Sequence, residues 1–214
     1  MLKIDNLSLS YGTQDVFSNL TMEISQGEMV CLCGESGCGK SSLLKAILGF
    51  VDTKGTIEFD GIHLNSNTID MVRRKTAYVP QDLSIPYDTV EQIATSLFEL
   101  RANRNIKFTT EALFADWTML GIDHALWQKQ ANEISGGQRQ RIMLSVAGLL
   151  GKRLLLADEP TSALDADSAL VVAKYFRMLT QKRNMTVLAV SHSEHFIKEC
   201  DRTITLQTNN QNAK

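Results

Sequence analysis

The sequence predicts an α/β protein: a parallel sheet with helices on both faces, an antiparallel β subdomain at the N-terminus and an inserted α-helical subdomain. Continuous apolar runs at 28–33, 153–158 and 186–192 are typical of strands that are buried on both faces of a sheet. An amphipathic segment at about 166–182 separates the last two runs, which gives the strand–helix–strand order of a parallel sheet. Residues 82–150 have a helical pattern instead.

The sequence before the helical insertion predicts one buried strand, four further strands and one helix. The expected elements are strands at LKIDNLSLS (2–10) and TMEIS (21–25), the buried strand at 28–33, a helix at KSSLLKAILGF (40–50), and strands at GTIEFDG (55–61) and TAYVP (76–80). Alternation of apolar and polar residues predicts that the first two strands are antiparallel. Leu43, Leu44 and Ile47 recur at helical spacing, and Gly49 is expected to end that helix.

The segment TTEALFADWTMLG (109–121) predicts an amphipathic helix in the inserted subdomain. Its apolar face consists of Leu113, Trp117 and Leu120. Thr109 or Thr110 can serve as the N-cap, because a threonine hydroxyl accepts a hydrogen bond from a free N–H of the first turn. Gly121 can adopt the left-handed conformation that closes a helix.

These elements predict a single domain over 1–214 with two lobes. We expect a core lobe at about 1–81 and 151–208, a helical subdomain at about 82–150, and a polar, disordered tail at 209–214.

Composition narrows the possible partners and compartment. The net charge of −2 gives no electrostatic footprint for nucleic acid, so no nucleic-acid partner is expected. The densest basic run, Arg73 to Lys75, is interpreted as a solvated helix end. The longest apolar run, 142–151, is shorter than the ~20 residues that cross a bilayer, so a membrane role requires a partner.

The four cysteines show no CxxC spacing, and the N-terminus lacks the apolar stretch of a signal peptide. Cys31 and Cys33 alternate with apolar residues in a strand and are expected to be reduced thiols that act as small core residues. The remaining two are Cys38 and Cys200. Cysteine usage therefore favours a cytosolic compartment.

The segment GESGCGKS (34–41) fits G-x-x-x-x-G-K-[ST] and lies between a predicted buried strand and a predicted helix. Glycines allow consecutive N–H groups to curl around phosphate oxygens, and the start of the helix favours an anion. Lys40 can reach the β- and γ-phosphates, and the Ser41 hydroxyl can bind Mg²⁺. The alternative, a tight turn without a ligand, does not account for this context. The core is therefore interpreted as a P-loop NTPase core of the RecA-like kind.

RLLLADEP delivers two carboxylates where a buried strand ends, which is where open α/β sheets bind ligands. Asp158 is positioned to hold Mg²⁺, and Glu159 is the candidate general base for an attacking water. On its own the motif could equally be a strand followed by a capped turn. The phosphate loop in the same chain favours the catalytic interpretation.

EISGGQRQR (133–141) predicts a second helix N-terminus that is rich in free N–H groups. One chain has little use for two phosphate cradles unless the second serves the nucleotide of another molecule. Together the motifs resemble the ATP-binding cassette ATPase family, whose L-S-G-G-Q signature is matched here by Ile134–Gln138. The resemblance covers nearly the whole chain.

The resemblance implies roles for further residues. Tyr11 matches the aromatic residue that stacks on adenine, and Gln81 matches the glutamine that reaches Mg²⁺ and the attacking water. Asp165 in SALD matches the loop that crosses to the partner subunit, and His192 matches the histidine that contacts the γ-phosphate. The residues implied in ATP binding are Tyr11, Gly34, Glu35, Ser36, Gly37, Cys38, Gly39, Lys40, Ser41, Ser42, Ser135, Gly136, Gly137, Gln138 and Asp165.

The implied catalytic residues are Glu159, His192, Gln81 and Lys40, and the implied Mg²⁺ ligands are Ser41, Gln81 and Asp158. The chain departs from the family at SVAGLL (145–150), where an arginine is common. Cys38 has no catalytic role, but if exposed beside an anion-binding helix start it would be a reactive thiol.

The resemblance implies an ATPase subunit of a membrane transporter, acting as an ATP-dependent, head-to-tail homodimer with separate transmembrane permease subunits. It would be cytoplasmic and peripheral on the inner face of the membrane, with residues 82–94 resembling the surface that receives the permease. The compact length resembles ATPases of metal or iron export or of lipoprotein release. A soluble assembly factor, as in iron–sulfur cluster biogenesis, is the alternative. A small GTPase or kinase lacks support because no Asn-Lys-x-Asp motif is present, and a non-hydrolysing sensor is disfavoured by Glu159 and His192.

Overall fold

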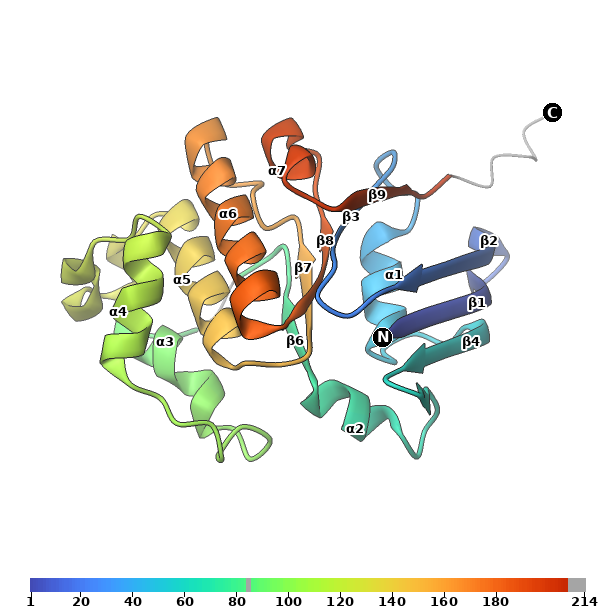
Figure 1. Ribbon diagram of the computed structural model, residues 1–214, viewed down its shortest axis with the longest axis horizontal. Coiled ribbons are helices and arrows are strands. Elements are labelled where there is room, and N and C mark those ends of the chain that lie inside the picture. Colours follow the sequence, from blue (N-terminus) through green and yellow to red (C-terminus); the bar gives the residue numbers. More distant parts are fainter. Residues whose placement is uncertain (84–85, 208–214) are drawn as a thin grey trace.

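The computed structural model describes residues 1–83 and 86–207, and it contains the predicted α/β architecture with two sheets (Figure 1). The predicted tail at 209–214 lies outside the described residues. The strands are β1 (Leu2–Tyr11), β2 (Gln14–Ile24), β3 (Met29–Cys33), β4 (Lys54–Phe59), β5 (Ile62–His63), β6 (Thr76–Val79), β7 (Leu154–Asp158), β8 (Thr186–Val190) and β9 (Arg202–Thr205). The helices are α1 (Lys40–Ile47), α2 (Ile69–Arg74), α3 (Val90–Glu99), α4 (Thr110–Met119), α5 (Gly136–Leu149), α6 (Ala166–Arg183) and α7 (Glu194–Lys198), with short 3₁₀ turns at His124–Gln128 and Ala131–Glu133.

The antiparallel sheet has the strand order β2-β1-β4-β5, and the predicted pairing of the two N-terminal strands is confirmed. Leu2 pairs with Ile24 and Ile4 with Met22, so one face of the hairpin carries a continuous row of apolar side chains. These residues are buried, as the alternating pattern of the sequence requires.

The parallel sheet has the order β6-β7-β8-β3-β9, and each neighbouring pair in it is parallel. Figure 1 shows α1 and the antiparallel sheet on one side of it, and α5 and α6 on the other. Successive residues of a strand therefore enter different cores: Val30 and Leu32 pack with α1, whereas Met29 and Cys31 pack with the helices opposite. Because the strands are parallel, their carboxyl ends meet at one edge of the sheet.

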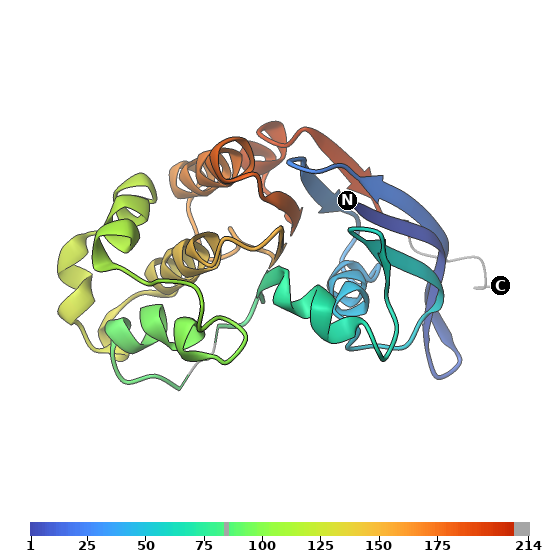
Figure 2. The ribbon, with the colours of Figure 1, turned by 60° about the horizontal axis from the view of Figure 1, so that its bottom comes forward.

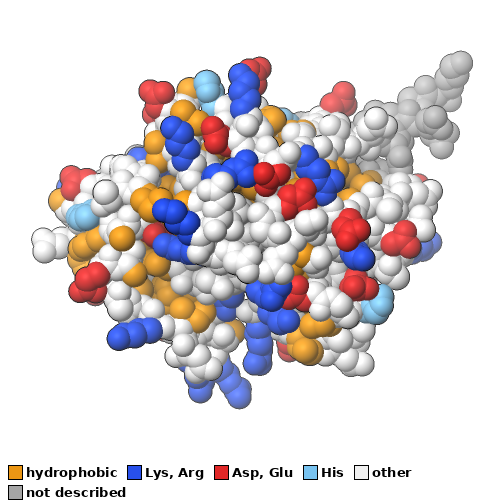
Figure 3. All heavy atoms as spheres, in the orientation of Figure 1, with side chains coloured by type: hydrophobic (Ala, Val, Ile, Leu, Met, Phe, Trp, Pro, Cys, Tyr) orange, Lys and Arg blue, Asp and Glu red, His pale blue; other side chains and the backbone are white. Residues whose placement is uncertain are grey.

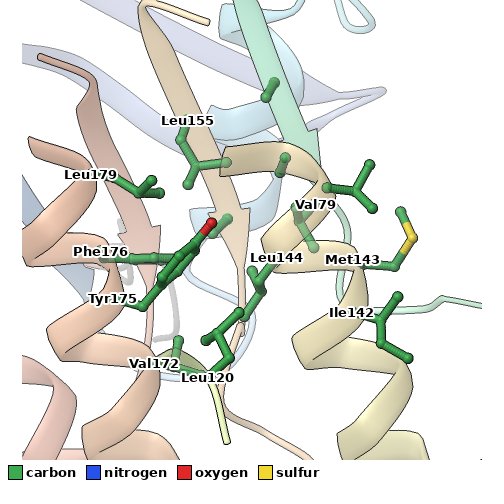
Figure 4. Packing of buried hydrophobic residues seen from close by; sticks show 14 of the residues in the cluster. Val79, Leu120, Ile142, Met143, Leu144, Leu155, Val172, Tyr175, Phe176 and Leu179 are labelled. Atoms are coloured by element: carbon green, nitrogen blue, oxygen red, sulfur yellow. The ribbon is translucent and has the colours of Figure 1, made fainter. Parts of the chain in front are cut away.

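The α5–α6 side of the sheet holds a large apolar core. Figure 4 shows Tyr175 and Phe176 of α6 packed near Leu144 of α5 and Leu155 of β7. All four residues are at most 1% exposed. This packing fixes α5 against one face of the parallel sheet.

Helices α3, α4 and α5 lie together, away from the antiparallel sheet (Figure 2). Thr109 is the N-cap of α4, since its side chain accepts from the N–H of Ala112. Trp117 is fully buried, and its indole donates a hydrogen bond of 3.1 Å to Ser145 of α5. Helices α4 and α5 form where the sequence predicts them, while the division into two lobes stays a prediction.

The basic run lies at a helix end, as predicted: Arg73 and Arg74 are in the last turn of α2, and Lys75 is its C-cap. Arg74 is exposed, whereas Arg73 is only partly exposed. The guanidinium of Arg73 donates to the carbonyls of Leu48 and Gly49, at 2.9 and 3.2 Å, and lies over the ring of Phe50. Arg73 thus satisfies carbonyls that the end of α1 leaves free. Lys75 is also engaged, with its Nζ 3.5 Å from a carboxylate oxygen of Asp60.

The distribution of surface charge and the hydropathy of the helices both bear on which partners the protein can have. On the face drawn in Figure 3, basic and acidic side chains are interspersed over most of the surface. Over residues 1–83 and 86–207, no helix is both long enough and apolar enough to traverse a bilayer.

Candidate functional site

The loop of residues 34–39 joins the end of β3 to the start of α1, and its glycines are required by its backbone. Gly34, Gly37 and Gly39 have φ angles of 143°, 82° and 98°, which side chains disfavour. A Cβ on Gly39 would lie 2.4 Å from Val16, and one on Gly34 would lie 2.5 Å from a backbone oxygen. Gly39 caps α1 without a side-chain hydrogen bond, so the first N–H groups of the helix are left to bind an anion.

Lys40 lies inside the curl of this loop. Its Nζ donates to the carbonyl oxygens of Gly34 and Glu35, both at 2.8 Å, and the residue is only 7% exposed. The lysine therefore holds the loop closed and places a positive charge in it. Phosphate oxygens offer the same kind of acceptor as these carbonyls.

Ser41 and Asp158 come together as the sequence predicts, with Oγ donating to Oδ1 at 3.0 Å. Burial raises the pKa of Asp158, and the hydrogen bond from Ser41 and two nearby lysines act against that rise. A hydroxyl and a carboxylate are hard oxygen donors, which is the donor set that Mg²⁺ prefers, so these two residues fit that ion.

Glu159 and His192 form the second carboxylate contact of the site, with Oε1 3.3 Å from Nε2. Glu159 has a φ of 51°, an uncommon value for a residue with a side chain. Burial raises the pKa of Glu159, and His192 and Lys40 oppose this effect. A partly buried carboxylate beside an imidazole can accept a proton from a water molecule.

A cavity of about 350 Å³ brings together Lys40, Ser41, Glu159 and His192, whereas Asp158 lies behind Ser41 and does not line it. It is lined by Tyr11, Gln14, Val16, Ser36, Gly37, Gly39, Lys40, Ser41, Ser42, Gln81, Glu159, Val190 and His192. Tyr11 is half exposed at the mouth, with its hydroxyl 3.4 Å from Oγ of Ser42. Sequence reasoning missed Gln14 and Val16, although the short turn after Tyr11 pairs Gln14 with it across the hairpin.

The second glycine-rich helix start, at the N-terminus of α5, lies outside the cavity of the phosphate loop. Ser135 is the N-cap of α5, and it forms a capping box with Gln138: each side chain accepts from the other residue's N–H. Gly136 lines a different cavity, of about 360 Å³, whose other lining residues are Gln81, Asp82, Leu83, Ile134, Arg139, Gln140, Ser162 and Ala163. Among residues 1–83 and 86–207, only Gln81 lines both cavities.

Asp165 does not line the cavity of the phosphate loop. It is the N-cap of α6, and its Oδ1 accepts from the N–H of Ser168 at 2.7 Å. Ser135, Gly137, Gln138 and Asp165 are thus not brought to the site of Lys40 within one chain.

The exposure on which a reactive Cys38 depends is not met. Its side chain is fully buried beneath the phosphate loop, because the loop turns it toward the interior against Gly34. The expectation for Cys33 is only partly met, since it is half buried, with its sulfur 3.5 Å from that of Cys31. The described cysteines are free thiols.

In the segment SVAGLL (145–150), which lacks the arginine expected there, Val146 and Gly148 are both buried on α5. No space for a Cβ exists at Gly148, since it would lie 2.1 Å from the hydroxyl of Tyr175. Tyr175 takes part in a buried polar network with Asp116 and Arg183. This network supplies the polar contacts between α6 and the inserted helices.

Comparison with known proteins gives consistent matches. The family model described as ABC transporter matches residues 17–162. The probable iron export ATP-binding protein FetA of Escherichia coli is 30% identical, over 97% of this chain and 91% of that protein. The ATP-dependent lipid A-core flippase of Desulfotalea psychrophila is 32% identical over 96% of this chain, which spans 36% of the flippase.

A solved structure also matches the fold at nearly full length. It is the dimeric ATP-binding cassette MJ0796 in a post-hydrolysis state bound to ADP and Pi. The TM-score is 0.81 and the identity 26%, with 97% of this chain and 94% of that chain covered.

Proposed function

The chain belongs to the ATP-binding cassette transporter family, and from this premise we propose that it is the ATP-hydrolysing subunit that powers a membrane transporter through ATP-driven dimerisation. As a member of this family it binds ATP and hydrolyses it to ADP and phosphate. The observation that carries the proposal is the single cavity that gathers Lys40, Ser41, Glu159 and His192, while the ISGGQ segment lies outside it.

Hydrolysis at this site needs charge neutralisation and a positioned water, because the transition state of phosphoryl transfer is loose. Lys40 exchanges its bonds to the loop carbonyls for bonds to the β- and γ-phosphates. Glu159 orients the water and accepts its proton, and His192 supports this carboxylate and the γ-phosphate. Ser41, Asp158 and Gln81 would hold Mg²⁺, which when bound offsets negative charge on the phosphates.

Tyr11 and Gln81 complete the nucleotide site. The half-exposed ring of Tyr11 offers a face for stacking on adenine at the mouth of the cavity. Gln81 lines both cavities, and its amide is therefore proposed to sense the γ-phosphate and the position of the inserted helices together.

The dimer is proposed to be head-to-tail. In it, Ser135 and Gly137 of one subunit close on the γ-phosphate held by Lys40 of the other, and Asp165 lies near the crossing. The separation of the two cavities within one chain supports this arrangement, because each site then lacks half of its phosphate donors. The dimeric MJ0796 cassette is a precedent for dimerisation in a similar protein.

Separate transmembrane permease subunits are the proposed partners, which would make the chain cytoplasmic and peripheral on the inner face of the membrane. The surface proposed to receive the permease is residues 82–94, of which 84–85 lie outside the described residues. Relatives named for iron export, lipid A-core flipping and phosphonate import are all similar to this chain. We therefore assign the transporter class and no cargo.

The test is ATP-dependent dimerisation of Glu159→Gln, measured by size-exclusion chromatography with light scattering. We expect a monomer without nucleotide, a dimer with Mg-ATP, and loss of hydrolysis. Ser135→Arg in the same background should bind ATP and stay monomeric, because the bulky arginine at the N-terminus of α5 prevents that helix from approaching the nucleotide of the other subunit. Glu111→Gln, at an exposed glutamate of α4, is the matched control and should hydrolyse ATP normally.

Two results would contradict the proposal. One is a Glu159→Gln variant that stays monomeric although titration shows it saturated with Mg-ATP. The other is undiminished hydrolysis by that variant. Co-purification with membranes from its own cells separates the transporter subunit from a soluble assembly factor, which would remain in the supernatant.

A further inference from the structure

We propose that Gln140 is a positioning residue for the catalytic carboxylate: its side-chain amide holds the main chain of Glu159 in the orientation that hydrolysis requires. Gln140 lies on α5, one helical turn after Gly136, where that helix begins. It thereby links the start of α5 to the nucleotide site of the same chain. The inference rests on the proposed role of Glu159 as general base.

The link is one partly buried hydrogen bond. Nε2 of Gln140 donates to the backbone carbonyl of Glu159 at 2.8 Å, and Gln140 is 3% exposed. The acceptor is a carbonyl, which can only accept, so the NH₂ end of the amide has to face it. The flipped amide would set two acceptors against each other.

The backbone that receives this bond is conformationally unusual. Glu159 has a φ of 51°, and such a conformation persists in a residue with a side chain only when its surroundings hold it. Its N–H donates to the carbonyl of Val190 at 3.0 Å. Its carbonyl accepts from Ser162, through N–H at 3.2 Å and through Oγ at 3.1 Å, besides Gln140. Three donors on one carbonyl fix the peptide, and with it the direction in which the carboxylate leaves toward His192.

Packing alone does not account for a glutamine here. Oε1 of Gln140 is buried and accepts no hydrogen bond from any part of the chain that the structure describes. Leaving a buried acceptor unpaired is costly, so methionine or leucine would fill the same volume more favourably. The bond to Glu159 is the feature that only the amide provides.

Gln140 also lies beside the ISGGQ segment (Ile134–Gln138). It lines the second cavity together with Gly136, Arg139 and Gln81. A helix moves as a rigid unit over one turn, so a displacement of α5 at Gly136 reaches Gln140 and then the Glu159 peptide. The hydrolysis rate at a site therefore depends on the position of α5 in the same subunit.

The test compares Gln140→Met with the wild type, because methionine keeps the length and removes the donor. We expect kcat for ATP hydrolysis to fall about three- to tenfold, the size of one lost hydrogen bond. The KM for ATP, nucleotide affinity, and ATP-dependent dimerisation measured with Glu159→Gln should stay unchanged. Gln128→Met, at an exposed glutamine, is the matched control and should leave kcat unaltered.

A second variant guards against misfolding of the first. Ser162→Ala, at an exposed position, removes another donor to the same carbonyl and should lower kcat in the same way, by about threefold or less. Both changes are then placed in the Glu159→Gln background, where single-turnover hydrolysis measures the residual rate. If Gln140 acts through Glu159, neither change lowers that residual rate further.

The outcomes separate this inference from the proposed function. An unchanged kcat in Gln140→Met and Ser162→Ala overturns the inference. An equal loss with and without Glu159→Gln also overturns it, since Gln140 would then act by another route. A fully active Glu159→Gln overturns the proposed general base, and the inference with it.

Discussion

The hydroxyl of Tyr175 on α6 donates a hydrogen bond of 2.6 Å to Oδ2 of Asp116 on α4. Asp116 is 1% exposed, and Nη1 of Arg183 lies 2.8 Å from the same oxygen. Burial raises the pKa of Tyr175 well above its ordinary value, and the neighbouring carboxylate acts in the same direction, so the hydroxyl remains a donor. Two buried groups, Tyr175 and Asp116, and the partly exposed Arg183 thus tie α4 to α6.

Replacing Tyr175 by phenylalanine should destabilise the protein by about 1–3 kcal/mol, because Asp116 loses a donor in a buried place. Urea unfolding followed by circular dichroism measures this difference. Tyr78→Phe is the control, since the Tyr78 hydroxyl makes no described hydrogen bond and its loss should cost about 0.5 kcal/mol or less. Equal effects of the two changes would contradict the role assigned to the Tyr175 hydroxyl.

Gly148→Ala should destabilise the protein by about 1–3 kcal/mol, although alanine is the better helix former. The added Cβ would lie 2.1 Å from the Tyr175 hydroxyl and 3.0 Å from Leu179, and both side chains are buried. In a Tyr175→Phe background the closest contact is removed, so Gly148→Ala should cost less there. Strictly additive unfolding energies in the double variant would show that the two residues do not clash.

Lys40→Ala should weaken ATP binding about tenfold or more, which corresponds to the loss of charge-assisted hydrogen bonds. The loop also loses the donor that bridges Gly34 and Glu35, so the closed conformation is no longer held. Isothermal titration with Mg-ATP checks the prediction. Lys54→Ala, at an exposed lysine of β4, should bind ATP as the wild type does.

Native-state alkylation should spare Cys33 and Cys38. Burial is the main cause that raises the pKa of Cys33 to about 12, so its reactive thiolate is about one part in ten thousand at pH 8. Cys38 is protected by complete burial. Iodoacetamide labelling followed by mass spectrometry should find these two sites unmodified in buffer and modified in guanidinium. Rapid native labelling of Cys38 would mean that the loop opens widely.

The Asp201 carboxylate should make stability depend on pH in the acid range. Partial burial raises the pKa of Asp201. The N–H of Met29 and the guanidinium of Arg177 together lower it by a larger amount, so the net pKa lies below the ordinary value. The stabilisation is present above the pKa of unfolded Asp, about 4, and is lost as pH falls through the lower folded value. Wild type should therefore melt above Asp201→Asn at pH 7, and the two melting temperatures should converge toward pH 2.

Many structural features of this protein follow from local sequence patterns. The buried strands, the caps at Thr109 and Ser135, and the phosphate loop all depend on residues close in the sequence, and each forms where the pattern predicts. The meeting of Ser41 with Asp158 also follows, because parallel strands bring their carboxyl ends to one edge.

Other features depend on how distant elements pack. Arg73 reaches the end of α1 from 25 residues away, and Tyr175 meets Asp116 across 59 residues. The burial of Cys38, the bond from Gln140 to Glu159, and the placement of the two glycine-rich helix starts in separate cavities belong to this group. Periodicity and motif spacing describe one element at a time. By itself the sequence determined the phosphate loop and predicted which groups would handle phosphate. Only the tertiary structure decided which of them share a site, because side-chain neighbours across elements are set by the close packing of the core.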